Sequence, residues 1–583
     1  MATELISIGI IFVFAVIGGI IAARLKQPAV FGLIIIGALI GPNALNLVRD
    51  VKAIGIMADI GAVLIAFAIG LEFSVSKLAK SGVRTILLAM LKFGIVLFLS
   101  YKLTLFLGIS PGTSLFLGMI ISFSSTMIVV KILEQKSMLS RKEVPLLIGI
   151  LIIENVVAIL LLTIFTGIHG SSDSMFIVLR KLLIAMSILS LSYLILLKSS
   201  KYIINVGNML KVDDSVFVFV SLSIIALFSY FAYYLGLPAS FGAFLAGSLI
   251  ASMPNAKDFG KVTGPYAMVF TSMFFISIGM MVNFTAIEEN IFLIMGLVIA
   301  VFLSRFIAIG FMTYFLANFR NESPFFASLA MLPIGEFSLI IAKQAGYFGV
   351  NGIDMVTMTA SLIVITALAM SLTINHSERM YSISRKLMPS KFMASLESVA
   401  DYLRRFFDHL DLETTFTKQL KKEAKMAILY ILLAVVGFFV LVGMTPLINP
   451  GGKLWISIVL YLMGFLAMAA VSMPIYLHLK GVQHLLAVIL ANVDASGNLA
   501  RCYRIINTML LAFMLFFTGL LFPFVIFAFG LGKWANLIPF AVGFTAFVYF
   551  ERLVKLICGS SVYTQTRKIM VGQPGSFSKK IDF

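Results

Sequence analysis

A few ionisable side chains lie inside long apolar runs of this sequence, where each charge costs about 2.5–3.5 kcal/mol if it stands at the centre of a bilayer. Glu154 and Asn155 stand together in the run 144–166, and Arg305 stands in the run 290–317. One carboxylate and one guanidinium at comparable depth predict a buried ion pair. The carboxylate is also available to bind a cation or a proton, whereas the alternative is a static pair that only fixes helix packing.

Three further ionisable residues are weaker candidates for the same chemistry. Asp59 and Lys92 lie within other apolar runs, either as residues that line a pathway or as a pair that reaches towards the surface. Glu336 directly follows a Pro-Ile-Gly sequence, where a carboxylate can hold helix ends or attract cations. We treat all three as accessory candidates.

Two runs contain residues that break a membrane helix. Four hydroxyl side chains occur within Ser122-Phe-Ser-Ser-Thr126, and Pro333-Ile-Gly-Glu336 combines proline with glycine. Unwound backbone at membrane depth is tolerated only where it lines a cavity or is buried in protein. We therefore expect two broken helices, although small-residue packing, with hydroxyls bonded to the preceding turn, is the simpler alternative for either segment alone.

The composition defines the elements that must position these residues. Of the 583 residues, 60% are apolar and 12% are charged, against roughly 25% charged residues in an average soluble domain. Together with a mean hydropathy of +1.06, these values exclude a soluble globular protein and a disordered chain. We predict an all-α polytopic membrane protein.

A membrane helix needs about 20 mostly apolar residues, and the sequence offers such runs in two sets. The first set, of about thirteen, is 5–23, 29–47, 53–72, 83–107, 113–133, 144–166, 175–198, 215–234, 238–253, 267–284, 290–317, 324–346 and 353–375. The second set, of about four, is 426–444, 455–478, 507–531 and 535–551.

Residues 377–425 separate the two sets and differ from both in composition. Lys and Arg alternate there with apolar residues at helical spacing, and Pro389 interrupts the segment. We expect two basic amphipathic helices at the cytoplasmic surface. The predicted domains are a membrane domain over 1–376, this linker, further membrane helices over 426–553 and a cytoplasmic tail over 554–583.

The net charge of +18 follows from topology. With the N-terminus outside, the even-numbered connections hold little beyond Arg49 and Lys52, and the odd-numbered ones are basic, as the positive-inside rule requires of cytoplasmic loops. The basic residues of these odd-numbered connections are Arg24, Lys26, Lys77, Lys80, Arg84, Lys136, Arg141, Lys142, Lys198, Lys201, Lys211, Lys257, Lys261 and Arg320. We predict a multi-pass protein of the plasma membrane, in contact with membrane lipids, with a cytoplasmic C-terminus and no nucleic-acid partner.

The first set of runs contains an internal repeat. The segment 28–40 aligns without gaps on 238–250, matching a proline, a Phe-Gly pair, a second glycine and a Leu-Ile pair. The two copies, about 5–166 and 215–375, start on opposite sides of the membrane. An inverted repeat with a pair of broken helices is the architecture of secondary transporters, and the breaks indicate the binding site.

An ordered set of motifs identifies a family. The motifs are Ile40-Gly-Pro42, Ile69-Gly-Leu-Glu72, Ser124-Ser-Thr126, Ile153-Glu-Asn155, Phe241-Gly-Ala-Phe-Leu-Ala-Gly247, Phe274-Phe-Ile-Ser-Ile-Gly-Met280 and Ile334-Gly-Glu-Phe337. Over about 5–375 the chain resembles the monovalent cation:proton antiporters, in particular the Kef-type potassium and Nap-type sodium branch. The resemblance implies a homodimer in which a six-helix core domain moves against a dimerisation domain.

The resemblance also implies the site. It makes Ser125, Thr126, Glu154 and Asn155 the candidates for ion and proton binding, and Arg305 the match for the basic residue of the family. The chain departs from the family at the motif of the sixth span, where Asp-Asp, Asn-Asp or Gln-Asp is usual and the second acid binds the ion. Here the acid is Glu154 and the second position is Asn155. Either Glu154 has taken over the carrier role or the site is altered.

The predicted function is secondary antiport of Na⁺ or K⁺ against H⁺ by alternating access, with Glu154 as the carboxylate for which cation and proton compete. We expect no enzymatic activity, no cofactor and no metal beyond the transported cation. No G-x-G-x-x-G follows a strand pattern and no Walker motif occurs in the sequence, so no nucleotide-binding regulatory domain is expected. Two alternatives stay open: a cation channel or gated K⁺ efflux pathway, and a non-transporting sensor that retains the fold.

Overall fold

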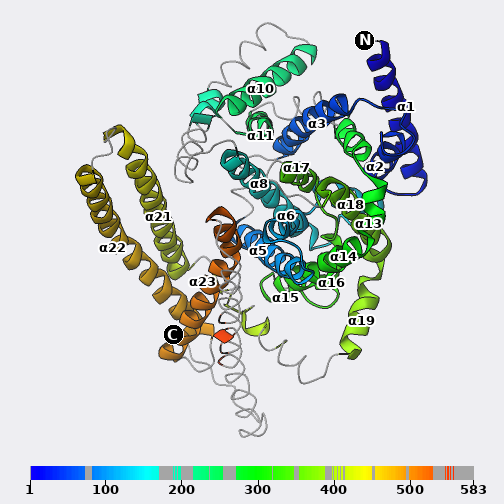
Figure 1. Ribbon diagram of the computed structural model, residues 1–583. Helices are drawn as coiled ribbons and strands as arrows, with labels where there is room; N and C mark the ends of the chain where they lie inside the picture. Colours follow the sequence, from blue (N-terminus) through cyan, green and yellow to red (C-terminus); the bar gives the residue numbers. More distant parts are fainter. Residues whose placement is uncertain are drawn as a thin grey trace. The chain divides into compact units, whose positions relative to one another are not determined.

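The computed structural model of the chain describes residues 2–72, 82–169, 188–189, 191–193, 195–198, 214–235, 237–253, 269, 271–317, 319–346, 353–387, 397, 400–403, 405–406, 409–410, 414–448, 454–493, 498–529 and a few isolated positions beyond them. Within these residues every regular element is a helix, apart from a single bridge between Ser124 and Ile334. The prediction of an all-α fold is confirmed (Figure 1).

The first repeat is described as seven helices. They are α1 (Ala2–Arg24), α2 (Ala29–Ile40), α3 (Val51–Glu72), α5 (Gly82–Phe106), α6 (Pro111–Ser122), α7 (Thr126–Gln135) and α8 (Val144–His169). The expected seventh span, 175–198, lies largely outside the described residues.

The second repeat and the segment that follows it are also helical. Their elements are α10 (Asp214–Tyr234), α11 (Ala239–Ala251), the apolar helix Thr271–Met280, α13 (Phe284–Glu289), α14 (Ile291–Arg305), the π-helix η1 (Phe306–Gly310), α15 (Phe311–Phe315), α16 (Ser323–Ala330), α17 (Glu336–Ala345), α18 (Met355–Thr373), the 3₁₀-helix η3 (Ile374–His376) and α19 (Ser377–Leu387). Among the described residues, six helices are long and apolar enough to cross a membrane, and they include α3, α5, α8 and the run from α14 to α15.

Both predicted helix breaks are present. The expected span 113–133 is two helices, α6 and α7, separated at 123–125, and the expected span 324–346 is α16 and α17, separated at 331–335. Ser125 caps α7, because its side-chain oxygen accepts a hydrogen bond from the backbone N–H of Ile128 at 3.2 Å. Pro333 lacks an N–H group to continue α16.

The two segments that the sequence pairs as a repeat make matching close approaches to other helices. A Cβ atom added to Gly37 of α2 would lie 2.3 Å from the carbonyl oxygen of Ile276, and one added to Gly247 of α11 would lie 2.2 Å from that of Phe67. Gly37 and Gly247 are equivalent positions of the repeat. Each copy therefore crosses a helix of the other copy where only glycine leaves room.

The chain divides into two compact units. The first unit comprises Met1–Thr313 and Phe319–Tyr381, and the second comprises Tyr314–Asn318 and Ser382–Phe583. In the first unit, α6 and α17 pack against each other, with α5, α8 and α18 beside them (Figure 1). In the same unit α1 packs against α2, and α11 packs against α3 and α10.

The second unit contains α21 (Thr415–Ile448), α22 (Leu454–Val493) and α23 (Leu499–Phe529). Three of the four expected C-terminal spans lie in these helices, and the fourth, 535–551, lies almost entirely outside the described residues. Helix α21 begins before the apolar run, so four lysines of the expected linker form its first turns. They are Lys418, Lys421, Lys422 and Lys425.

Candidate functional site

The two helix breaks cross each other in the first unit. The backbone N–H of Ser125 donates to the carbonyl of Pro333 at 3.0 Å, and the N–H of Gly335 donates to the carbonyl of Phe123 at 3.1 Å. A Cβ atom at position 335 would lie only 2.8 Å from the carbonyl oxygen of Ser124. The unwound segments, which are buried in the protein, thus satisfy part of each other's backbone hydrogen bonding.

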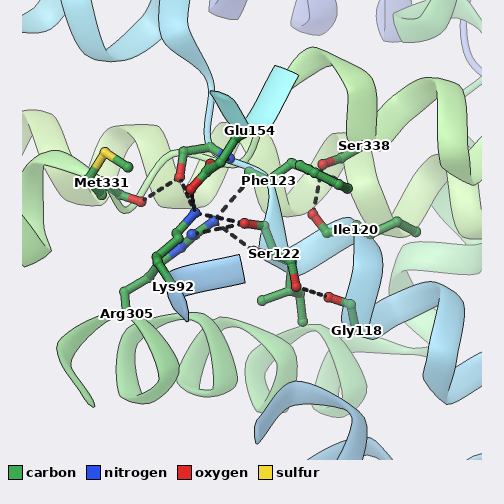
Figure 2. A network of polar contacts seen from close by, with 11 residues as sticks. Lys92, Gly118, Ile120, Ser122, Phe123, Glu154, Arg305, Met331 and Ser338 are labelled. Carbon is green, nitrogen blue, oxygen red and sulfur yellow. Dashed lines mark hydrogen bonds and ion pairs between the residues drawn. The ribbon is translucent and has the colours of Figure 1, made fainter. Parts of the chain in front are cut away.

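Glu154 of α8 lies at this crossing. Its side chain is 1% exposed, and its Oε2 atom accepts a hydrogen bond of 3.0 Å from the backbone N–H of Ser124. Its Oε1 atom lies 2.5 Å from the Nζ atom of Lys92 on α5 (Figure 2). The carboxylate is therefore held on one side by the crossing and on the other by an ammonium group.

Lys92 joins Glu154 to the end of the first broken helix. Its Nζ atom donates to the carbonyl of Ser122 at 2.7 Å and to the Oγ atom of Ser124 at 2.9 Å. The side chain is fully buried. Because α5 packs against both α6 and α8, the ammonium group reaches the carboxylate and the helix end together.

Arg305 binds the same helix end by a different route. Its guanidinium donates to three carbonyls at the C-terminal end of α6, those of Ile121 at 2.7 Å and of Ser122 and Phe123 at 3.1 Å (Figure 2). These carbonyls lack partners within the helix and carry the negative end of its dipole. The guanidinium therefore caps the C-terminal end of α6.

These contacts correct two pairings suggested by the sequence. Glu154 forms its ion pair with Lys92, and the Arg305 fork is turned to the backbone of α6 because three carbonyls match its planar set of donors. Asp59 does not meet Lys92. It pairs instead with Lys343 of α17 at 2.5 Å, where the Asp59 side chain is 69% exposed.

The remaining predicted site residues lie next to the breaks. Asn155 donates from Nδ2 to the Oγ1 atom of Thr126 at 3.1 Å, and Ser125 and Thr126 are both buried at the start of α7. Glu336 is the first residue of α17 and is 3% exposed, at a helix end where a negative charge is favourable. The structure thus brings Ser125, Thr126, Asn155 and Glu336 to the two breaks, together with Glu154.

Two side chains at the crossing were not singled out by the sequence. Ser124 binds both members of the ion pair: its backbone N–H donates to Glu154, and its hydroxyl accepts from Lys92 and donates to the carbonyl of Met331 at 3.4 Å. Ser338 of α17 donates to the carbonyl of Ile120 at 2.7 Å, which ties the second broken helix to the first (Figure 2). The signal for Ser124 was its place among four hydroxyls, whereas Ser338 carries no local signal.

Comparison with known proteins identifies the class. Residues 11–376 match the family described as "Sodium/hydrogen exchanger, transmembrane". The chain belongs to this family of transporters, within the monovalent cation:proton antiporter superfamily, and is a multi-pass membrane protein. The resemblance noted in the motifs is confirmed.

Individual relatives are named as antiporters. The chain is 28% identical to the Na⁺/H⁺-K⁺ antiporter GerN of Bacillus cereus over 62% of this chain and 92% of that protein. It is 26% identical to the K⁺/H⁺ antiporter subunit KhtU of Bacillus subtilis over 66% and 96%. With the K⁺ efflux antiporter 5 of Arabidopsis thaliana it shares 27% identity over 58% of this chain and 60% of that protein. A solved structure, that of the sodium proton antiporter MjNhaP1 from Methanocaldococcus jannaschii, is similar with a TM-score of 0.48 and 15% identity over 65% of this chain and 98% of that one.

Proposed function

We propose that this protein exchanges a monovalent cation, Na⁺ or K⁺, for protons by alternating access, with Glu154 as the carboxylate at which cation and proton compete. The observation that carries the proposal is the position of Glu154, a buried carboxylate held between the N–H of Ser124 and the ammonium of Lys92 where two broken helices cross. The names of the relatives support exchange against protons and include both cations. We also propose a homodimer in the plasma membrane, with the N-terminus outside.

Charge balance explains how one site can serve both ions. In their charged forms, the buried side chains at the breaks supply two negative charges, from Glu154 and Glu336, and two positive charges, from Lys92 and Arg305. A cation that enters without the loss of a positive charge leaves a buried charge uncompensated, which is costly. The cation therefore binds as the Lys92–Glu154 pair releases one proton, and it leaves as the pair takes the proton back.

The binding groups follow from the same contacts. When the Lys92–Glu154 pair has released its proton, the cation can take the position of the ammonium at the Glu154 carboxylate, so proton and cation compete at this carboxylate. Hydroxyl and amide oxygens of Ser125, Thr126 and Asn155 lie buried beside the break, where they can replace part of the hydration shell of the cation. Arg305 remains hydrogen-bonded to the carbonyls of α6 and thereby holds the backbone at the crossing in its geometry.

Transport in proteoliposomes tests the proposal. Purified protein is reconstituted with an imposed pH gradient, and Na⁺, K⁺ or Li⁺ is added in separate runs. We expect at least one cation to dissipate the gradient with the wild type but not with Glu154→Gln. The matched control is Glu134→Gln, because Glu134 is an exposed glutamate of α7 that pairs with Lys131. A wild type that moves no protons with any cation contradicts the proposal, and cation currents that need no proton gradient point to a channel instead.

A further inference from the structure

The first turns of α21 carry a basic face. Its four lysines stand at positions i, i+3, i+4 and i+7, on one side of the helix, and all four are exposed. They are Lys418, Lys421, Lys422 and Lys425. One acidic residue lies among them in the sequence, Glu423, and its carboxylate contacts the Nδ1 atom of His478 on α22 at 2.6 Å. The carboxylate is thus turned to the neighbouring helix, and the basic face has a net positive charge.

The same side of α21 becomes apolar within one turn. Leu429 follows Lys425 by four residues and Leu433 follows Leu429 by four more, so both leucines continue the line of the lysines along the helix. Their side chains are 47% and 52% exposed. Exposed leucines within the apolar run 426–444 require an apolar medium, which the acyl chains of lipids supply. One side of α21 therefore presents lysines and then, one turn further, a surface for acyl chains.

Helix α22, which packs beside α21 (Figure 1), changes from apolar to basic at the same level. Tyr476 and Leu477 are 56% and 54% exposed, and the exposed Lys480 follows one turn later with its Nζ atom 5.6 Å from the centre of the Tyr476 ring. The contact between His478 and Glu423 sets this part of α22 beside the lysines of α21. A tyrosine and a lysine at the end of an apolar run are typical of the boundary between membrane and water. Two helices of the second unit thus place the lipid headgroups at one level.

We propose that the basic face of α21 binds the phosphate group of an anionic phospholipid, while the acyl chains of the same lipid lie along Leu429 and Leu433. Lysines next to a membrane helix attract anionic headgroups. A zwitterionic headgroup carries a positive charge of its own beside its phosphate, so the four lysines favour the anionic lipid. The site lies wholly within the second unit and beyond the family match, which ends at residue 376. It is independent of the ion exchange proposed above.

Quenching of a single tryptophan measures lipid binding at this position in the full-length chain. Trp455→Phe/Trp534→Phe removes both tryptophans of the sequence, and Leu429→Trp then places one beside the basic face. The protein is reconstituted in mixtures of phosphatidylglycerol and phosphatidylcholine, of which one at a time carries brominated acyl chains that quench on contact. We expect a preference for phosphatidylglycerol on the order of tenfold. The control is Ile299→Trp on α14, because residue 299 is 54% exposed and the one basic residue of that helix, Arg305, is buried. Equal quenching of Leu429→Trp by the two lipids overturns the proposal.

Removal of single charges tests which residues make the site. Lys421→Gln and Lys425→Gln, each added to the Leu429→Trp protein, should lower the preference for phosphatidylglycerol about fivefold, the effect of one lysine near an anionic surface. Lys421→Arg keeps the charge and should keep the preference. The control is Lys52→Gln, which removes an exposed lysine from the first unit and should change nothing. If both glutamine variants retain the full preference, the basic face does not bind the lipid.

A soluble phosphate ester separates a lipid site from a site for free phosphate. Glycerol 3-phosphate carries the phosphate group without acyl chains, and at millimolar concentration it should leave the preference of Leu429→Trp for phosphatidylglycerol unchanged. If it abolishes the preference, the basic face binds a soluble phosphate ester and the lipid assignment is wrong. Quenching requires no ion transport, so a protein that exchanges no ions still gives a result for the lipid site.

Discussion

The Nζ atom of Lys92 lies 2.5 Å from the Oε1 atom of Glu154, and both side chains are 1% exposed. Lys92 also binds the carbonyl of Ser122, so the ammonium group is shared between the carboxylate and the negative end of α6. This pair defines the proton-loaded state of the proposed exchange. Four predictions can be measured, two for this pair and two for other contacts of the first unit.

Breaking the pair from one side should destabilise the protein. Lys92→Met leaves Glu154 buried without its partner, and we expect a loss of about 3–5 kcal/mol in the free energy of unfolding. The double variant Lys92→Met/Glu154→Gln removes the stranded charge and should recover much of that loss. Denaturant unfolding in detergent measures both values. The control is Lys131→Met, which breaks an exposed pair with Glu134 and should cost less than about 1 kcal/mol. Equal stability of Lys92→Met and the control would rule out a buried charged pair.

Competition at one pair predicts how exchange depends on pH. Lowering the pH loads the Lys92–Glu154 pair with its proton, so more cation is needed to displace it. In the range where the pair is protonated, each fall of one pH unit should raise the apparent KM for the cation roughly tenfold, while the maximal rate at saturating cation changes little. Rates measured at equal pH on both sides of the membrane, with isotope as tracer, give these constants. A KM that does not vary with pH would show that cation and proton use separate sites.

The shape of the Arg305 side chain should matter as much as its charge. Arg305→Lys keeps the positive charge, but a compact ammonium cannot span the carbonyls of Ile121, Ser122 and Phe123. We expect a loss of about 1.5–3 kcal/mol in stability and slower exchange. Arg49→Lys is the matched control, because Arg49 makes one exposed hydrogen bond to a carbonyl. If Arg305→Lys behaves like Arg49→Lys, the guanidinium has no role in closing α6.

The pair of Asp59 and Lys343 links α3, which packs against α11, to α17, which packs against α6 and α18. If α3 and α17 move relative to each other during exchange, a covalent link at this position should stop exchange. Asp59→Cys/Lys343→Cys, built on Cys502→Ser/Cys558→Ser, should lose exchange when crosslinked and regain it under reducing conditions. Asp59→Asn alone should change stability by less than about 1 kcal/mol, because the aspartate is exposed. Full exchange by the crosslinked protein would contradict movement between these helices.

The sequence predicted the helix breaks because their causes are local. Ser125 caps α7, and Pro333 and Gly335 prevent a continuous helix between α16 and α17. The similarity of 28–40 to 238–250 also has a local cause, because Gly37 and Gly247 lie where backbones touch and only glycine leaves room.

The pairings of charges could not be predicted in the same way. Whether Glu154 meets Lys92 or Arg305 depends on how α5, α8 and α14 pack around α6, and hydropathy holds no information on helix neighbours. The first turns of α21, which carry four lysines, show a second limit of prediction from the sequence. Helical spacing indicates a helix over Lys418 to Lys425 but does not distinguish a separate surface helix from the beginning of a longer one.

The most direct test of the central claim is to record cation uptake and proton release at the same time in proteoliposomes of the wild type and of Glu154→Gln. The account predicts one proton released for each cation taken up by the wild type, no dependence on an imposed membrane potential, and neither flux in Glu154→Gln. Exchange by Glu154→Gln at the wild-type rate, or cation uptake by the wild type without proton release, would contradict it.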